Sequence, residues 1–320
     1  MSLKPLITVF GATGTQGGSV ARALLQLAER PFRIRAVTRH PGSAAAQDLA
    51  ERGAEIIAAD FDDLHSVQRA LRGAYGAFCV TSFWEHRSPE RELRQAGRLA
   101  EAARRACVGH VIWSTQEDTR RFIEPDGEVM PVLMGRYNVP HFDAKGYADQ
   151  FFIGRGLPVT RLVSAFLWDW LVASALQPQH DAEGRRPFVL PLGNALLPGI
   201  AAADFGACTA ALFCQGEAAI GRRVGVAAEH LSGAQMATRL ACTLGEPVCH
   251  LAVDPADYAR LGHDGAAELA NMFRFVRDFN DEFCAVRNVA AARALHPALM
   301  TFDGFLAKHF STRPRDAALG

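Results

Sequence analysis

The sequence predicts an α/β fold with a doubly wound parallel sheet, and two observations support this prediction. In the first half of the chain, short apolar segments with β propensity alternate with longer segments that carry apolar residues at helical spacing. Single helices separate the strands, which is typical of βαβ units with parallel strands and right-handed crossovers. We therefore expect residues 1–162 to form the sheet domain. Residues 163–320, where the alternation weakens, are expected to form a smaller α+β lobe with some segments returning to the sheet.

The elements of the first domain follow from these patterns in chain order. Each expected helix places apolar residues three or four positions apart, as Val20, Ala23, Leu24 and Leu27 do in the first one. The strands are expected at residues 6–10, 33–38, 55–59, 76–80, 110–114 and 158–163, and the helices at residues 17–28, 43–52, 63–71, 88–107 and 142–154. Pro89 stands in the first turn of the long helix, where its missing N–H does no harm.

Proline and glycine mark the irregular parts of the chain. Residues 115–140 are rich in both, so we expect an ordered insertion or lid there rather than a strand. Beyond them, helices are expected at residues 202–215 and, with loop breaks, at residues 254–275. Turns are expected at Pro187, Pro191, Gly193, Pro198 and Gly199.

The composition is that of an ordinary globular protein and excludes several classes of partner. Lysine plus arginine equals aspartate plus glutamate at 34 each, so no basic excess favours nucleic acid or an anionic membrane. No apolar stretch is long enough to span a bilayer, and the N-terminus has no secretory pattern. The seven cysteines form no CxxC pair, so we expect buried, reduced thiols, no metal site and a cytoplasmic protein.

A glycine-rich segment directly follows the first expected strand. It has the spacing GxxGxxG, and a helix is expected to begin at once after it. Glycines there permit a tight turn and let backbone N–H groups approach a pyrophosphate, which the positive end of the helix attracts. An ordinary βα turn is the alternative, but this position at the start of a βαβ array favours a Rossmann-type dinucleotide site. The predicted binding residues are Gly11, Ala12, Thr13, Gly14, Thr15, Gln16 and Gly17.

The end of the second strand indicates which dinucleotide is bound. An acidic residue there would hold the ribose 2′-OH of NAD, but the chain has Arg39. Its planar, charged guanidinium suits a 2′-phosphate, and no carboxylate stands beside it to repel that group, so NADP(H) is predicted. The alternative is a solvated surface arginine. Asp60, after the third strand, is expected near the adenine or, equally, as the N-cap of the next helix.

Five motifs together resemble the NmrA-like family of atypical short-chain dehydrogenases over nearly the whole chain. They are Gly11-Ala-Thr-Gly-Thr-Gln-Gly-Gly-Ser-Val20, Val37-Thr-Arg39, Thr81-Ser-Phe-Trp84-Glu, His141-Phe-Asp-Ala-Lys145-Gly and Glu268-Leu-Ala-Asn-Met-Phe-Arg-Phe275. The resemblance implies an NADP(H)-binding Rossmann domain with a small C-terminal lobe. It also implies that residues 11–16, Arg39, Asp60, Thr81, Ser82, Phe83, Trp84 and Lys145 line the dinucleotide.

Short-chain dehydrogenases use serine, tyrosine and lysine, with tyrosine and lysine four apart on one helix. Here Ser114 ends the fifth strand, Lys145 lies in the helix, and His141 stands where the tyrosine would be. His141 is either a general acid, since imidazole changes charge near neutral pH, or a helix-start residue of a site that has lost its chemistry. Tyr137 and Tyr147 are alternative proton donors, although packing is favoured for Tyr137.

Two functions follow from these observations. The first is an NADP(H) sensor or regulator with weak or no dehydrogenase activity, because the dinucleotide site is intact while the tyrosine is missing. The second is an NADPH-dependent reductase of a small apolar carbonyl, quinone or imine, with the aromatic residues of Phe83–Trp84 and residues 166–170 as a candidate pocket or partner surface. A lyase or isomerase with a structural cofactor is a weaker third. The substrate, the partner protein and the oligomeric state, a homodimer included, stay open.

Overall fold

The computed structural model describes residues 4–173 and 178–310. The chain divides into two compact units. Unit 1 contains residues 1–164, 202–226 and 290–297, and unit 2 contains residues 165–201, 227–289 and 298–320. Residues 202–226 thus belong to the same unit as the glycine-rich segment, although they come much later in the sequence.

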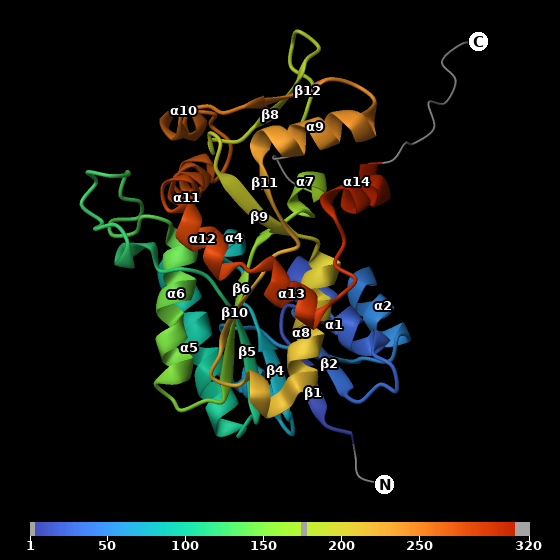
Figure 1. Ribbon diagram of the computed structural model, residues 1–320. Coiled ribbons are helices and arrows are strands. Elements are labelled where there is room, and N and C mark those ends of the chain that lie inside the picture. Colours follow the sequence, from blue (N-terminus) through green and yellow to red (C-terminus); the bar gives the residue numbers. More distant parts are fainter. Residues whose placement is uncertain (1–3, 174–177, 311–320) are drawn as a thin grey trace. The chain divides into compact units, whose positions relative to one another are not determined.

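Unit 1 is built on a seven-stranded sheet in which every pair of neighbours is parallel (Figure 1). Its strand order is β10-β6-β5-β4-β1-β2-β3. The strands are β1 (Leu6–Val9), β2 (Arg33–Thr38), β3 (Glu55–Ala58), β4 (Gly76–Cys79), β5 (His110–Thr115), β6 (Val159–Ser164) and β10 (Arg223–Val226). The chain first moves outward from β1 to β3 and then continues on the other side from β4. The predicted doubly wound α/β fold is confirmed, and its topological switch point lies between β1 and β4.

Helices cover both faces of this sheet, as the alternation of β4 shows. Phe78 contacts Phe205 of α8, whereas Ala77 and Cys79 belong to the core beneath the helices of the other face. Helices α1 and α8 pack together, as do α5 and α6 (Figure 1). Helix α5 also packs with α3. The helices of unit 1 are α1 (Thr15–Gln26), α2 (Ala44–Glu51), α3 (Leu64–Leu71), α4 (Phe83–His86), α5 (Pro89–Arg105), α6 (Pro140–Ile153), α8 (Ala202–Gln215) and α13 (Val289–Leu295), with short 3-10 turns at Thr119–Arg121 and Gly216–Ala219.

Most elements expected in the first half are present within about two residues, and their ends have local causes. The side chains of Ser43 and Ser88 cap α2 and α5 by accepting backbone N–H groups. Two details differ from expectation. Helix α6 begins at Pro140, so His141 lies in its first turn, and the four-residue helix α4 was not expected. Too short for a periodic pattern, α4 cannot be recognised from hydrophobic spacing.

Unit 2 contains two small sheets and six helices within its described residues. The strands are β7 (Phe166–Leu167), β8 (Arg186–Val189), β9 (Leu196–Ile200), β11 (Glu229–Ser232) and β12 (Val248–Leu251), and the helices are α7 (Trp170–Ala173), α9 (Gly233–Leu244), α10 (Pro255–Ala259), α11 (Ala266–Asp278), α12 (Asn280–Val286) and α14 (Phe302–Phe310). Trp168 is buried against Phe302 and Phe305, and a Cβ on Gly199 would lie 2.0 Å from its indole nitrogen. Trp168 is therefore a core residue.

Two further expectations are wrong in part. Pro187 lies in β8, and Pro198 and Gly199 lie in β9 rather than in turns. Strand β7 pairs only with residues 199 and 200 of β9, so the missing N–H of Pro198 falls beyond that pairing. The cysteines are free thiols, but Cys107, Cys214, Cys242 and Cys249 are exposed, so the expected burial holds only for Cys79 and Cys208 and in part for Cys284.

None of the described helices combines the length and apolar character that crossing a membrane requires.

Candidate functional site

The glycine-rich loop joins β1 to α1 at the switch point of the sheet. Gly11 has φ +62°, a left-handed conformation that favours glycine. A Cβ on Gly17 would lie 2.3 Å from the carbonyl oxygen of Gly11, so only glycine lets α1 approach the loop this closely. Gly14 is the N-cap of α1 and brings no capping side chain, and no acidic residue stands in the first turn. The first-turn N–H groups lack intrahelical acceptors, which suits them to an anion.

Neighbouring strands hold this loop in place. The N–H of Ala12 donates to the carbonyl of Val37 in β2, and the hydroxyls of Thr13 and Thr38 are 3.1 Å apart. Ala12 and Gly17 are buried, whereas Thr13, Gly14 and Thr15 are exposed. The predicted residues thus form one loop whose outer rim, at the start of α1, faces solvent.

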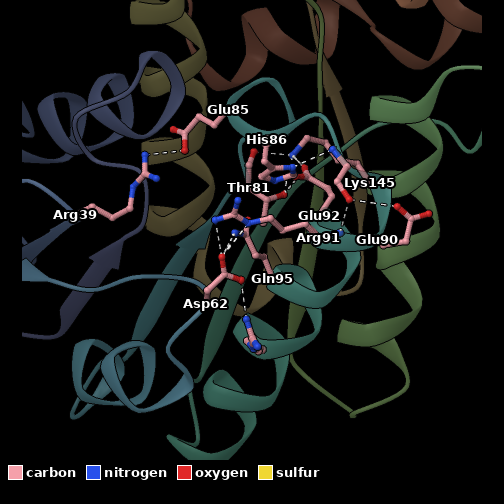
Figure 2. A network of polar contacts seen from close by, with 12 residues as sticks. Arg39, Asp62, Thr81, Glu85, His86, Glu90, Arg91, Glu92, Gln95 and Lys145 are labelled. Carbon is pink, nitrogen blue, oxygen red and sulfur yellow. Dashed lines mark hydrogen bonds and ion pairs between the residues drawn. The ribbon is translucent and has the colours of Figure 1, made fainter. Parts of the chain in front are cut away.

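Arg39 follows β2 and forms an ion pair with Glu85 of α4 (Figure 2). Its Nη2 lies 2.7 Å from Glu85 Oε2, and both side chains are nearly half exposed. The expectation that no carboxylate stands beside Arg39 is therefore wrong. The carboxylate comes from the far side of the switch point, a tertiary pairing that the local sequence around Arg39 does not indicate.

Asp60 is an exposed residue that follows β3. Its carboxylate accepts the N–H of Asp62 at 2.8 Å, and its own N–H donates to Ser66 Oγ. The N-cap of α3 is Asp63, which accepts the N–H of His65. The capping alternative for Asp60 is thus wrong, and its place near an adenine stays a prediction.

Lys145 lies at the centre of a buried polar network next to the end of β4 (Figure 2). Its ammonium lies 2.8 Å from the carbonyl oxygen of Thr81, 2.9 Å from Thr81 Oγ1 and 2.8 Å from Glu92 Oε1. The Thr81 hydroxyl donates to the same Glu92 oxygen at 2.6 Å. A lysine ammonium has three N–H donors, and here three acceptors of the protein surround it.

Glu92 and His86 complete this network, and sequence reasoning missed both. The Glu92 side chain is fully buried. Burial alone would raise the pKa of Glu92, but the Lys145 charge and contacts from His86 and Thr81 lower it to about 2, so the group is a carboxylate. His86 Nδ1 accepts the N–H of Ser88, and its Nε2 lies 3.3 Å from Glu92 Oε2.

One signal for Glu92 was present in the sequence. Glu92 shares a helical face with Ala96, Leu99 and Ala103, all of them buried, so its position in α5 pointed inward. An acidic residue on such an apolar stripe indicates a buried partner of opposite charge.

His141 occupies the first turn of α6 and is packed among aromatic rings. It is 8% exposed. Its ring centre lies 5.0 Å from that of Trp84 and 5.9 Å from that of Phe83. Phe83 is buried, Trp84 is partly exposed, and Ser82 precedes them as the N-cap of α4. The structure therefore brings His141 to α4.

Ser114 is buried at the end of β5, where its hydroxyl donates to Gln16 Oε1 at 2.7 Å. This bond ties β5 to the glycine-rich loop. The hydroxyl of the next residue, Thr115, donates to Asp149 Oδ1 and lies 3.2 Å from the carbonyl oxygen of Lys145, which fixes α6 against β5. The three predicted catalytic side chains thus have distinct partners: Gln16 for Ser114, α4 for His141, and Thr81 with Glu92 for Lys145.

The two tyrosines near this site differ in exposure. Tyr137 is buried, its hydroxyl lies 3.4 Å from Glu90 Oε1, and burial raises its pKa. Tyr147 is 42% exposed and packs edge-on against Phe151. The packing interpretation of Tyr137 agrees with these contacts.

Residues 115–140 are tied to α6 by one buried carboxylate. Asp143 accepts the N–H groups of Thr119, Asn138 and Val139 at distances of 2.8 to 3.0 Å. Burial raises the pKa of Asp143, although these hydrogen bonds oppose that shift. Both ends of the insertion are therefore anchored to the helix that carries His141 and Lys145.

Comparisons with known proteins agree with this architecture. The profile of the NmrA-like family matches residues 3–306. The chain is 32% identical over 182 residues to the NmrA-like family domain-containing oxidoreductase himF of Aspergillus japonicus, an alignment that covers 55% of this chain and 50% of that protein. The chain therefore spans about half the length of that relative.

Two solved structures share the fold. NmrA, a negative transcriptional regulator, superposes with a TM-score of 0.77 at 19% identity, covering 97% of this chain and 96% of that one. NmrA has been crystallised with NAD and with NADP. The Citrobacter sp. triphenylmethane reductase complexed with NADP(H) superposes with a TM-score of 0.73 at 17% identity, covering 95% and 99%. One neighbour is thus a regulator and the other a reductase.

Proposed function

Since the chain belongs to the NmrA-like family of NAD(P)-binding oxidoreductases, we propose that it binds NADP(H) and acts as a sensor or regulator with weak or no dehydrogenase activity. The pyrophosphate would lie on the N–H groups at the start of α1, above the loop from Gly11 to Gly17. Arg39 would bind the 2′-phosphate, and Asp60 would lie near the adenine. Residues 81–84 would line the dinucleotide beside β4. Family membership and the NADP complexes of structural neighbours support this assignment.

The arrangement of Lys145 is the observation that carries the regulatory role. In the usual dehydrogenase arrangement, this lysine holds the ribose and lowers the pKa of a tyrosine four residues earlier. Here the ammonium is surrounded by Thr81 and Glu92, and the residue four positions earlier is a histidine packed on Trp84. The lysine would have to give up a buried partner to bind a ribose hydroxyl. The site therefore favours cofactor binding over proton transfer.

A reductase is the second candidate, and the curated relatives favour it because they are named oxidoreductases. In this function NADPH would deliver hydride to the carbon of a small carbonyl, quinone or imine. The proton would pass from the His141 imidazolium to the substrate oxygen or nitrogen. Trp84 is the partly exposed ring beside His141 and would form one wall of an apolar substrate pocket.

One experiment separates the two functions. The purified protein would be titrated with NADPH by calorimetry and then incubated with NADPH and a panel of quinones, aldehydes and imines while absorbance at 340 nm is followed. Micromolar binding without turnover supports the regulator. Turnover that His141→Ala abolishes while NADPH affinity is retained, and that the exposed control His65→Ala leaves intact, would contradict it. A protein that binds no dinucleotide would contradict both functions.

A further inference from the structure

The carboxylate of Glu85 lies against the guanidinium of Arg39, the group proposed to bind the 2′-phosphate of the cofactor. Arg39 follows β2, where a ribose 2′-phosphate is expected in this fold. Its guanidinium already pairs with Glu85 at 2.7 Å, and both groups are nearly half exposed (Figure 2). An exposed ion pair of this kind is weak and exchanges readily. The 2′-phosphate carries more charge than a carboxylate and presents several acceptor oxygens to the guanidinium.

We propose that Glu85 is a specificity-determining residue that competes with the 2′-phosphate of NADP(H) for Arg39, and that α4 transmits this exchange to the far end of the site. The inference rests on the proposed binding of NADP(H). A cofactor without the 2′-phosphate leaves the Arg39–Glu85 pair in place. A cofactor with the phosphate displaces Glu85, because two anions cannot share one guanidinium at this distance without repulsion.

Helix α4 connects the two ends of the site because its consecutive residues have different partners. Trp84 contacts His141, Glu85 pairs with Arg39, and His86 faces Glu92. Successive side chains of a helix point about 100° apart, so one turn presents these three residues in three directions. In the proposed exchange the backbone of α4 shifts together with Glu85, which would change the contacts of Trp84 or His86 in the same turn.

The backbone after α4 suits such a change. Arg87 has φ +48°, a conformation that residues other than glycine rarely adopt, and its N–H donates to the carbonyl of Phe83. The residues just before this turn contact two different groups. Glu85 belongs to the exposed ion pair with Arg39, and His86 faces the buried Lys145–Glu92 network. The exposed side is the weaker of the two and yields first.

Glu85→Gln tests the competition. The variant removes the negative charge and keeps the size of the side chain, so the affinity for NADP⁺ should rise by about three- to tenfold while that for NAD⁺ stays within about twofold. The gain should shrink in high salt, because the pair is exposed. Glu217→Gln is the matched control, since it removes the same charge from an exposed residue that precedes β10 at the amino edge of the sheet. The control should change neither affinity.

The fluorescence of Trp84 tests whether α4 transmits the exchange at Glu85. Adenosine 2′,5′-bisphosphate carries the phosphate but no nicotinamide, so it does not quench the indole through a nicotinamide ring. It should change the tryptophan fluorescence of the wild type more than AMP does, and the change should disappear in Trp84→Phe. The apo Glu85→Gln protein should already show part of this change.

The outcomes separate the inference from the function on which it rests. A wild type that binds neither NADP⁺ nor NAD⁺ would contradict the proposed function. Binding of NADP⁺ with equal effects of Glu85→Gln on both cofactors, or with weaker NADP⁺ binding in that variant, overturns the competition alone. A fluorescence response that survives in Trp84→Phe overturns the transmission through α4.

Discussion

Replacing Glu92 by glutamine tests whether the buried network organises the site. The substitution removes the charge but keeps the shape and one acceptor oxygen for Thr81. Lys145, whose side chain is 13% exposed, is then left without its counter-charge. Removing one partner of a buried ion pair costs roughly 3–5 kcal/mol, because the remaining charge is neither paired nor solvated.

The pKa of Glu92 gives the sign of this effect. Burial raises this pKa, but the Lys145 charge and the hydrogen bonds to the carboxylate outweigh burial and lower it from 4.5 to about 2, so the folded protein favours the ionised form. A loss of roughly 3–5 kcal/mol should lower the midpoint of thermal unfolding of this 320-residue chain by roughly 4–8 °C at neutral pH. Circular dichroism or calorimetry measures that midpoint, and Glu90→Gln, an exposed change in the same helix, should shift it by far less.

The pH dependence follows from the direction of the shift. A carboxyl group whose pKa is lowered by folding stabilises the protein above its unfolded pKa and loses this effect as the pH falls. The difference between wild type and Glu92→Gln should therefore be full above pH 4.5 and shrink as the pH falls toward 2. Combining Glu92→Gln with Lys145→Met should cost less than the sum of the single changes, since the two groups interact. The proposed role of the network would be refuted if Glu92→Gln lowered the melting midpoint by less than 2 °C, or if the destabilising effects of the two substitutions were additive.

Two further substitutions test Arg39 and the glycine-rich loop. Arg39→Ala removes one charge-assisted contact to the 2′-phosphate, so it should weaken NADPH binding by roughly 10- to 100-fold and NADH binding by less than about threefold. Calorimetry measures both affinities, and equal weakening of the two would contradict the NADP(H) assignment. Gly17→Ala places a Cβ 2.3 Å from the carbonyl oxygen of Gly11 and should cost about 1–3 kcal/mol of stability together with at least about tenfold in NADPH affinity. Gly14→Ala is its control for stability, because a Cβ there lies 3.4 Å from the same oxygen, and comparable melting midpoints of the two variants would contradict the close-packing argument.

The first half of the fold could be predicted from sequence because each element carries its own signal. The strands from β1 to β6 are short segments that contain several apolar residues each, and capping serines mark the starts of α2 and α5. The return of β10 to the sheet beside β6 was foreseen only in general terms. Pro198 lies in β9 although a proline usually indicates a turn. It pairs with β11, but β7 on the other side pairs only with the next two residues of β9.

The candidate site was predictable only where its residues are adjacent in the chain. The loop from Gly11 to Gly17 forms its geometry within one βα connection, so its spacing is visible in the sequence. The Arg39–Glu85 pair joins two connections on opposite sides of the switch point, and nothing in either segment indicates the other. Such pairings depend on strand order, which hydrophobic periodicity does not encode.

Lys145 shows why residue spacing alone does not establish chemistry. A lysine four positions after His141 keeps the register of a dehydrogenase site, and both residues lie on α6. Spacing fixes which face of the helix the two side chains share, but the charge partner decides what the ammonium does. Glu92 and Thr81 surround Lys145 from α5 and the end of β4, and Glu92 remains ionised because that ammonium is present. A ribose would have to compete with a buried carboxylate for the same protons, so the proposed proton transfer from His141 would depend on how strongly Glu92 holds Lys145.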